Sequence, residues 1–222
     1  MRKSKSVKLT TIPVSFKVKE ILPKVFHLKF NTRRDLASTM LRFQEYYESP
    51  KFRNQIFSLN QFVTWYRTQK GKFSYYNDWS GFNIPSKILK PFYDGKFQEL
   101  TVREQKILKT FKNHSKFYLI ATAKNKNKAN NQSVIRHEIA HALFYLNPDY
   151  QKEAIKSLKG LNLKPIHKYL KKLGYHPEVF LDECHAYILT DMDNMPTAGI
   201  KVEPYRKAHE LLVKNFNRYC KI

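Results

Sequence analysis

The sequence predicts an α+β protein that is mostly helical, with a small mixed sheet beside one nearly apolar helix. Apolar residues recur at helical spacing through much of the chain. Residues 24–30 and 116–123 are short segments rich in β-forming residues, as strands are. An apolar segment at 134–146 carries two histidines four residues apart, which places both on one helix face. With 222 residues, 42% of them hydrophobic, we expect one domain over 1–222 with a proper core.

Strands and helices of unassigned role are predicted over residues 1–115. The first helix should be capped by Asn31 or Thr32 and should end at Ser49-Pro50. The elements expected here are strands at 14–18 and 24–30, and helices after Asn31 or Thr32, at 52–66 and, from a capping box, at 101–111. Residues 71–91 are aromatic and loop-rich, and we assign them no chemistry.

The half of the chain over 116–222 is expected to carry the chemistry. Its strand at 116–123 leads through a polar loop at 124–132 into the apolar helix, which Asn147-Pro148 ends. The helices expected after it are at 149–158, 164–173, 177–190 and 203–220.

The apolar helix contains the HExxH pentad His137-Glu138-Ile139-Ala140-His141. On a helix the two imidazoles lie at i and i+4, which is the spacing for two ligands of a single zinc ion. Glu138 then points beside them, where it can take a proton from a metal-bound water. Polar groups on a buried helix need partners, and a zinc ion would satisfy all three side chains. The alternative is a pair of core histidines bonded to backbone carbonyls.

A catalytic zinc site takes three protein ligands and keeps one position open for water, so a third ligand is needed. Glu183, on the helix expected at 177–190, is the best candidate. His176, Glu183 and Tyr187 lie at i, i+7 and i+11, so one helix face would present a carboxylate, an imidazole and a phenol hydroxyl. Asp182 and His185 are rival ligands that point to other faces.

The pentad followed by a helical glutamate resembles the gluzincin clan of zinc metallopeptidases, and the resemblance covers residues from about 116 to 190. It implies a zincin-like fold, with His137, His141 and Glu183 as zinc ligands and Glu138 as the general base. Many gluzincins place an aspartate one turn after the glutamate ligand, where it holds the first histidine. Tyr187 stands at that position here, so the partner of His137 is left open.

These residues predict a zinc-dependent peptidase that acts on a peptide or protein substrate. Zinc would polarise the scissile carbonyl, and Glu138 would accept a proton from the attacking water and deliver it to the leaving amine. Tyr187 or His176, with Tyr175 close behind, would donate a hydrogen bond to the oxyanion.

A substrate-binding edge strand is expected beside the apolar helix that carries the pentad. In zincin-like enzymes the peptide adds to such an edge as a further strand. The strand at 117–123 lies closest upstream of the pentad and is expected to be this edge, with the loop at 124–132 overhanging the cleft. The alternative places that strand inside the sheet and makes 24–30 the edge.

The net charge of +23 indicates attraction to polyanions, or alternatively a lysine-rich composition without a role. The basic residues are scattered, with clusters at 2–8, 124–128 and 168–172, and no RNP-like or helix-turn-helix signature is present. The charge supports an alternative function. The protein would then be a basic nucleic-acid-binding protein with a structural or vestigial zincin-like core, or a peptidase tethered to nucleic acid.

Composition also bears on location. The two cysteines do not form a secreted disulfide framework or a zinc finger. No run of about 18 apolar residues is present, so no membrane span is expected. The basic start is followed by a polar segment that Pro13 interrupts, which is unlike a signal peptide. We expect a cytoplasmic protein, with export by a route that needs no cleaved signal left open.

Overall fold

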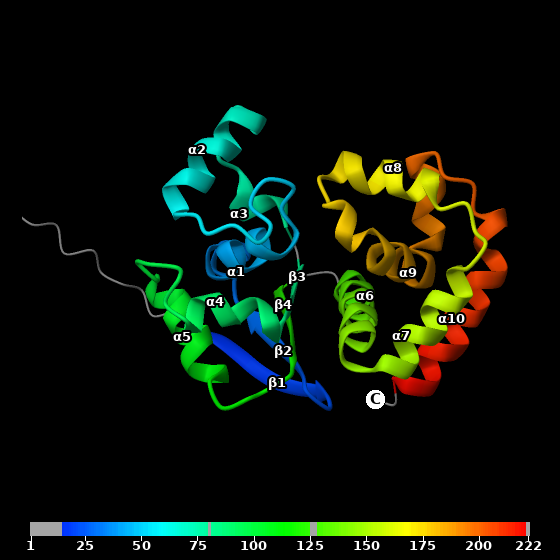
Figure 1. The fold of residues 1–222 in the computed structure, drawn as a ribbon, viewed down its shortest axis with the longest axis horizontal. Helices are drawn as coiled ribbons and strands as arrows, with labels where there is room; N and C mark the ends of the chain where they lie inside the picture. Colours follow the sequence, from blue (N-terminus) through cyan, green and yellow to red (C-terminus); the bar gives the residue numbers. More distant parts are fainter. Residues whose placement is uncertain (1–14, 80, 125–127, 221–222) are drawn as a thin grey trace, which may run out of the picture.

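The computed structural model describes residues 15–79, 81–124 and 128–220, apart from the side chains of 128–131, and it combines many helices with one small sheet (Figure 1). The strands are β1 (Phe16–Leu22), β2 (Val25–Phe30), β3 (Gly81–Pro85) and β4 (Tyr118–Ala123). The α-helices are α1 (Arg33–Glu48), α2 (Leu59–Lys70), α3 (Tyr75–Asp78), α4 (Lys90–Tyr93), α5 (Val102–Phe111), α6 (Lys128–Leu146), α7 (Pro148–Leu158), α8 (Lys164–Leu173), α9 (Phe180–Thr190) and α10 (Arg206–Tyr219). The 3-10 helices are η1 (Ser86–Leu89), η2 (Pro177–Val179), η3 (Met192–Ala198) and η4 (Glu203–Tyr205). The predicted mixture of helices and a small sheet is confirmed.

The four strands form one mixed sheet in the order β1-β2-β4-β3. β2 and β4 run parallel, whereas β1 with β2 and β3 with β4 run antiparallel. The prediction that 117–123 forms an edge was therefore wrong, because β4 lies between β2 and β3. The alternative edge at 24–30 was wrong too, because β2 lies between β1 and β4. β3 is the edge strand next to β4, and its sequence GFNIP hid it, because Gly, Asn and Pro are depleted in strands.

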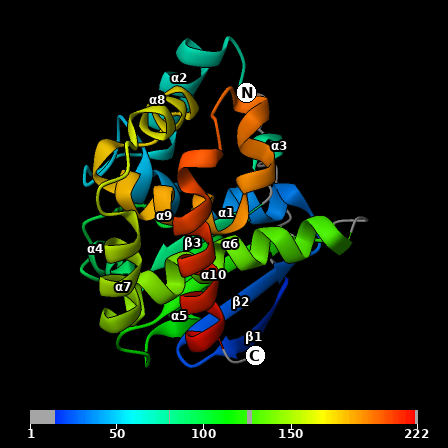
Figure 2. The same ribbon diagram turned by 90° about the vertical axis from the view of Figure 1, so that its right-hand side faces the viewer.

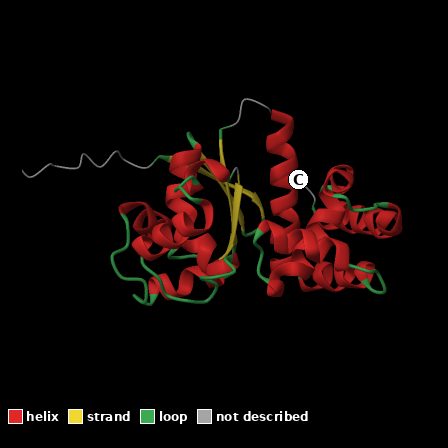
Figure 3. Cartoon of the chain, turned by 90° about the horizontal axis from the view of Figure 1, so that it is seen from above, coloured by secondary structure: helices red, strands yellow, loops and turns green. Residues whose placement is uncertain are grey.

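The sheet separates two layers of helices, as the view from above shows (Figure 3). α1 packs on one face of β3 and β4, and α6 packs against the same strands from the other side. Successive side chains of β4 point to opposite faces. Leu119, Ala121 and Ala123 join the core under α1, whereas Tyr118 and Ile120 join the core under α6. All of β4 is buried, as expected for a strand covered on both faces.

Residues 128–220 build the second helix layer, which Figure 2 shows face-on. α6 contacts the sheet, α7 and α9, and α9 in turn contacts α7, α8 and α10. α6 begins at Lys128, earlier than the predicted caps at 130–133, so part of the loop expected at 124–132 is helical. Among the residues that the structure describes, no helix has both the length and the apolar character that a membrane crossing requires.

Capping side chains set several helix boundaries. Thr32 caps α1 and Thr101 caps α5, both as predicted. α2 starts after Ser58 and not near residue 52, because Ser58 forms a capping box with Gln61 that was not recognised in the sequence. The structure thus shifts the predicted helix at 52–66 toward the C-terminus.

A buried ion pair fixes α1 against α5. Arg42 Nη2 lies 2.5 Å from Glu104 Oε2, and Arg42 Nε donates to Glu104 Oε1 at 2.7 Å. Such a two-point contact sets direction as well as distance. It therefore also positions the last residue of α1, Glu48, which reaches the site described next.

Candidate metal centre

Two packed helices bring the three predicted metal ligands together. α6 carries His137 and His141 one turn apart, and α9 presents Glu183 to them. The two Nε2 atoms are 3.2 Å apart, Glu183 Oε1 lies 3.6 Å from Nε2 of His141, and Glu183 Oε2 lies 4.0 Å from Nε2 of His137. Within the described ranges no other group of His, Cys, Asp and Glu side chains converges in this way.

The Nδ1 atom of each histidine contacts a carboxylate. Nδ1 of His137 lies 2.9 Å from Asp191 Oδ2, and Nδ1 of His141 lies 2.9 Å from Asp182 Oδ1. A ring nitrogen that faces an ionised carboxylate carries a hydrogen, so in the neutral form of either ring Nε2 is the acceptor. Two lone pairs that meet at 3.2 Å repel one another unless a proton or a metal ion lies between them.

The geometry fits a zinc ion. In a tetrahedral site with nitrogen and oxygen ligands about 2.0–2.1 Å from the metal, the ligand atoms are about 3.3 Å apart. The separation of the two Nε2 atoms, 3.2 Å, is close to that value, and the Glu183 oxygens lie slightly farther from them, at 3.6 and 4.0 Å. Glu183 is only 2% exposed, and its Oε2 accepts no hydrogen bond from a described residue. A buried carboxylate oxygen without a partner is costly, and a bound cation would remove that cost.

Burial and charge change the proton affinities of this group. Burial raises the pKa of Glu183 to about 7, although His141 and His137 oppose the rise. Burial alone would lower the pKa of His141, but the carboxylates of Asp182, Glu183 and Glu138 raise it well above 6.5. Burial also opposes ionisation of Asp182, yet His141 lowers the pKa of that carboxyl to about 2. The metal-free site therefore holds a proton, which a metal ion must displace.

A buried chain of polar contacts continues behind His141. His185 is fully buried, and its Nδ1 lies 3.1 Å from the backbone oxygen of Asp182 and 3.4 Å from Asp182 Oδ1. Its Nε2 lies 2.8 Å from the hydroxyl of Tyr150. Burial lowers the pKa of His185, so the ring is neutral. Asp182 and His185, the rival ligands, thus support His141 from behind and do not belong to the ligand group.

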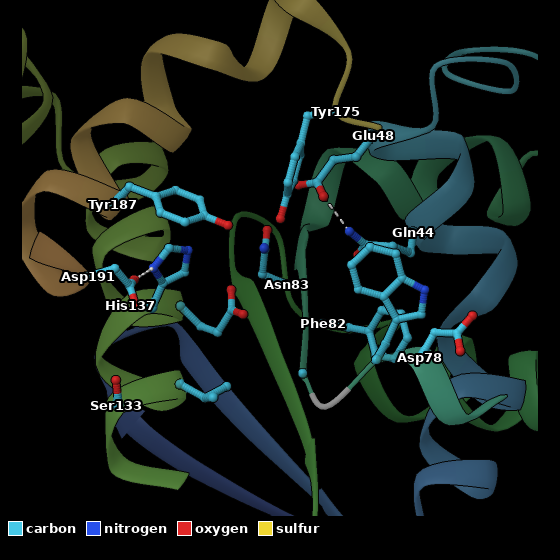
Figure 4. Close-up of a pocket in the computed structure, with 14 residues that line it drawn as sticks. Gln44, Glu48, Asp78, Phe82, Asn83, Ser133, His137, Tyr175, Tyr187 and Asp191 are labelled. Atoms are coloured by element: carbon cyan, nitrogen blue, oxygen red, sulfur yellow. Dashed lines mark hydrogen bonds and ion pairs between the residues drawn. The ribbon is translucent and has the colours of Figure 1, made fainter. Parts of the chain in front are cut away.

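The three predicted metal ligands, His137, His141 and Glu183, lie beside a cleft between the two helix layers (Figure 4). The residues that line the cleft are Gln44, Glu48, Asp78, Trp79, Gly81, Phe82, Asn83, Ser133, Val134, His137, Glu138, Tyr175, Tyr187 and Asp191. Glu138 is 8% exposed, and its Oε2 accepts no hydrogen bond from the described part of the chain. Its carboxylate is therefore available to take a proton from a group inside the cleft.

The edge strand β3 passes close to Glu138. A Cβ atom at Gly81 would lie 2.9 Å from Val134 Cγ1 and 3.4 Å from Glu138 Oε1, so only glycine fits without displacing a neighbour. Two residues on, Asn83 Oδ1 accepts a hydrogen bond of 2.6 Å from the buried hydroxyl of Tyr118. That contact orients the amide and leaves its nitrogen available as a donor to the cleft.

Of the three predicted oxyanion donors, the structure places two in the cleft and one outside its lining. Tyr187 and Tyr175 line the cleft, and the Tyr187 ring packs edge-on against that of His137, with 5.2 Å between their centroids. His176 is not among the lining residues. It caps η2 and accepts a hydrogen bond of 3.3 Å from the backbone N–H of Glu178. The helix expected at 177–190 begins as a 3-10 turn, so His176 does not continue the helix face that carries the metal ligand.

Three residues of the site were not predicted from the sequence. Asp191 was missed because the helical pattern places a partner of His137 on α9, whereas Asp191 follows the end of that helix. Glu48 and Asn83 come from α1 and β3, far from the pentad in sequence. Only the order of the strands and the packing of α1 bring these two residues to the cleft, and no local sequence pattern encodes either.

The predicted basic clusters are only partly described. Residues 2–8 and Lys126 lie outside the described residues, as does the side chain of Lys128, whereas Lys124 and Lys168 are exposed. No family model, curated protein or solved structure matches the chain. Assignment of a function to the cleft therefore depends on its geometry and chemistry.

Proposed function

We propose that the protein is a zinc-dependent peptidase of the gluzincin-like type. The observation that supports this best is the convergence of His137, His141 and Glu183 beside the unpaired carboxylate of Glu138, in a cleft. A structural zinc site is closed by four protein ligands, whereas three ligands at a cleft leave a position for water. A vestigial or structural metal core would also have no use for Glu138 in this place.

Each residue around the site has a role in this proposal. A bound zinc ion would supply a water of lowered pKa and would polarise the scissile carbonyl. Glu138 would accept a proton from the attacking water and would pass it to the leaving amine. Asp191 and Asp182 keep the two imidazole rings oriented, so that their Nε2 atoms face one another and would both be available to a metal ion.

Three side chains of the cleft supply hydrogen-bond donors for the oxyanion. The hydroxyls of Tyr187 and Tyr175 and the amide nitrogen of Asn83 lie in the lining. Preorganised donors of this kind stabilise the negative charge that develops on the carbonyl oxygen in the transition state. Of the two residues first proposed for this role, Tyr187 is retained and His176 is not.

A peptide substrate would lie along β3. This strand pairs with β4 on one side, and no described strand pairs with its other side. Gly81, Phe82 and Asn83 of β3 line the cleft next to Glu138. An extended peptide added to this edge would form main-chain hydrogen bonds and would present a carbonyl to the metal site.

Incubation of the zinc-loaded protein with a peptide library tests the proposal. We expect cleavage by the wild type and a loss of at least about a hundredfold in Glu138→Gln, since general-base catalysis contributes about that much. The substitution keeps the size of the side chain and the metal ligands, so zinc content serves as the matched control. Equal cleavage by the two proteins, or none by a zinc-loaded wild type, would rule out the proposed mechanism.

A further inference from the structure

Glu48 is a buried acid that the proposed chemistry does not use. It is the last residue of α1, is 8% exposed, and lines the cleft on the wall opposite His137 and Tyr187 (Figure 4). Its Oε2 accepts a hydrogen bond from Nε2 of Gln44, which comes from the same helix. Over the described ranges no Lys or Arg forms an ion pair with it.

The surroundings of Glu48 do not offset its charge. Burial and the like charges of Glu183, Glu138 and Asp182 raise the pKa of Glu48 well above its ordinary value, and the charge of His141 opposes the rise. The C-terminal end of α1 adds partial negative charge, and its last turn contains no basic residue. A buried carboxylate in such a place is costly unless a cation or a proton joins it.

The cleft differs in charge from the rest of the chain. The protein has 41 Lys and Arg residues and 18 Asp and Glu residues. Among the described residues that line the cleft there is no Lys or Arg, but there are Glu48, Asp78, Glu138 and Asp191. Asp191 contacts the imidazole of His137, and Asp78 accepts hydrogen bonds from Tyr66 and Ser74. Glu138 is the proposed general base. Glu48 has no such role, and its hydrogen-bond partner in the described structure is the side-chain amide of Gln44.

A role as a metal ligand does not explain Glu48. The side chains that converge with ligand spacing in the described structure are His137, His141 and Glu183, and Glu48 is not among them. A role in fixing α1 does not explain it either, because the Arg42–Glu104 ion pair already does this. While the cleft is empty, a proton can satisfy Glu48. For the ionised carboxylate, what remains is an interaction with a molecule that enters the cleft.

We propose that Glu48 is a specificity-determining residue that binds a positively charged group of the substrate, an ammonium or a guanidinium. The inference rests on the proposed peptidase function and names the substrate class, peptides with a cationic group close to the scissile bond. A substrate along β3 would pass between the metal ligands and Glu48, because α1 packs against β3 on the side away from α6. The cation would replace the proton of buried Glu48 and would supply the opposite charge that its carboxylate lacks, in a charge-assisted hydrogen bond.

The cation has two sources in a peptide, the free α-amine and the side chain of Lys or Arg. Three small probes separate them: acetyl-arginine amide carries only the side-chain charge, leucine amide carries only the α-amine, and acetyl-leucine amide is neutral. Binding of each probe to zinc-loaded Glu138→Gln protein is measured by calorimetry, which does not depend on turnover. We expect one charged probe to bind about ten to a hundred times more tightly than the neutral probe, as a hydrogen bond between charged groups provides.

Glu48→Gln, made in the same Glu138→Gln background, should remove this preference and leave the neutral probe within about threefold, because only a charged contact is lost. Asp78→Asn is the matched control, since it removes the same charge from the rim of the cleft and should leave the preference in place. Equal binding of all three probes by the parent protein would overturn the proposal even if Glu48→Gln failed to fold. So would an equal loss for charged and neutral probes in a folded, zinc-loaded Glu48→Gln protein.

Failure of this proposal is distinguishable from failure of the proposed function. If the wild type cleaves peptides without regard to charge, Glu48 has another role and the peptidase assignment stands. If charged probes bind through Glu48 but no peptide is cleaved, the cleft binds cations and the peptidase assignment is wrong. In the peptide library, a preference for cationic sequences that Glu48→Gln abolishes would support both.

Discussion

Asp191 holds His137 in place, with Oδ2 2.9 Å from the Nδ1 atom of the imidazole. Thr190 supports the contact, because its hydroxyl lies 2.9 Å from the same Nδ1 and donates to Asp191 Oδ2 at 2.8 Å. The first histidine is therefore held by the residue after α9, two helical turns beyond Glu183. Tyr187, one turn after Glu183, packs edge-on against the same ring.

This arrangement predicts that Asp191→Asn weakens zinc binding by about tenfold to a hundredfold, as loss of a carboxylate behind a metal-bound histidine does. The asparagine keeps the size of the side chain but removes the charge that favours Nδ1–H on His137. Zinc affinity is measured by competition with a chelator. Asp193→Asn is the control, since it makes the same charge change at an exposed position two residues away. Equal affinities for the two variants would show that Asp191 does not orient a metal ligand.

Metal content is predicted to distinguish ligands from the base. The purified protein should carry about one zinc ion per chain. His137→Ala, His141→Ala and Glu183→Ala should each lose most of the metal, whereas Glu138→Gln should retain it. Full zinc occupancy in Glu183→Ala would transfer the third-ligand role to another acid or imidazole, with Asp182 and His185 nearest to His141.

The response of stability to pH should depend on zinc. In the metal-free protein the pKa of Glu183 is raised to about 7 and that of His141 is raised above 6.5. Both groups then bind protons more tightly in the folded than in the unfolded chain. Their contribution to stability is fully present below the unfolded pKa values of 4.5 and 6.5, and it is lost as pH rises through the folded ones. The lowered pKa of Asp182 acts only at acidic pH, below its ordinary value of 3.8.

The melting temperature of the metal-free protein should therefore fall by several degrees between about pH 5 and pH 8 on account of these groups. Zinc takes the place of the protons, so the increase in melting temperature on adding zinc should grow over the same range. Scanning calorimetry with and without zinc measures both. A zinc-induced increase that stays constant with pH would contradict the predicted competition between proton and metal.

The positive charge has a separate test. If it binds polyanions, the protein should be retained on heparin at low salt and released steeply as salt rises, because each contact displaces counterions. Replacing the exposed cluster of Lys168, Lys171 and Lys172 on α8 by Gln should shift elution to lower salt. Absence of retention at physiological salt would favour the compositional explanation of the +23 charge.

The sequence predicted most of the local structure and the ligand group, because both depend on short-range patterns. Helix caps at Thr32 and Thr101 act within one turn, and the spacing of His137 and His141 within a helix is fixed by its geometry. Glu183, the proposed third ligand, could be predicted because it lies on a strongly patterned helix. Its convergence with the histidines in the structure agrees with the prediction.

The sheet order and the second wall of the cleft could not be predicted in the same way. A strand buried on both faces, such as β4, is easily recognised from its run of apolar residues, but its sequence does not indicate which strands pair with it. The edge strand β3 is short and contains residues that disfavour strands, so its role emerges only from pairing. Glu48 reaches the cleft because α1 packs on β3 and β4, a contact between segments distant in sequence.

Gly81→Ala tests the close contact between β3 and α6. The new Cβ would lie 2.9 Å from Val134 Cγ1 and 3.4 Å from Glu138 Oε1, so one of these side chains must move. Valine is restricted at χ1 and does not yield easily, and overpacking of this kind costs about 1–3 kcal/mol. We expect a lower melting temperature and a lower kcat, because Val134 must move, and Val134 lies one turn before the proposed base Glu138 on α6. Zinc content should stay the same, since the new methyl group approaches none of the three ligands.

Val134→Ala provides the control for this prediction. The substitution removes the atom that the new Cβ would meet, so the double variant should recover much of the stability and kcat lost in Gly81→Ala. A double-mutant cycle measures this recovery as an interaction between the two positions. If the two substitutions are simply additive in kcat, the contact between β3 and α6 does not position Glu138. If Gly81→Ala alone changes neither property, the edge strand is further from α6 than the structure places it.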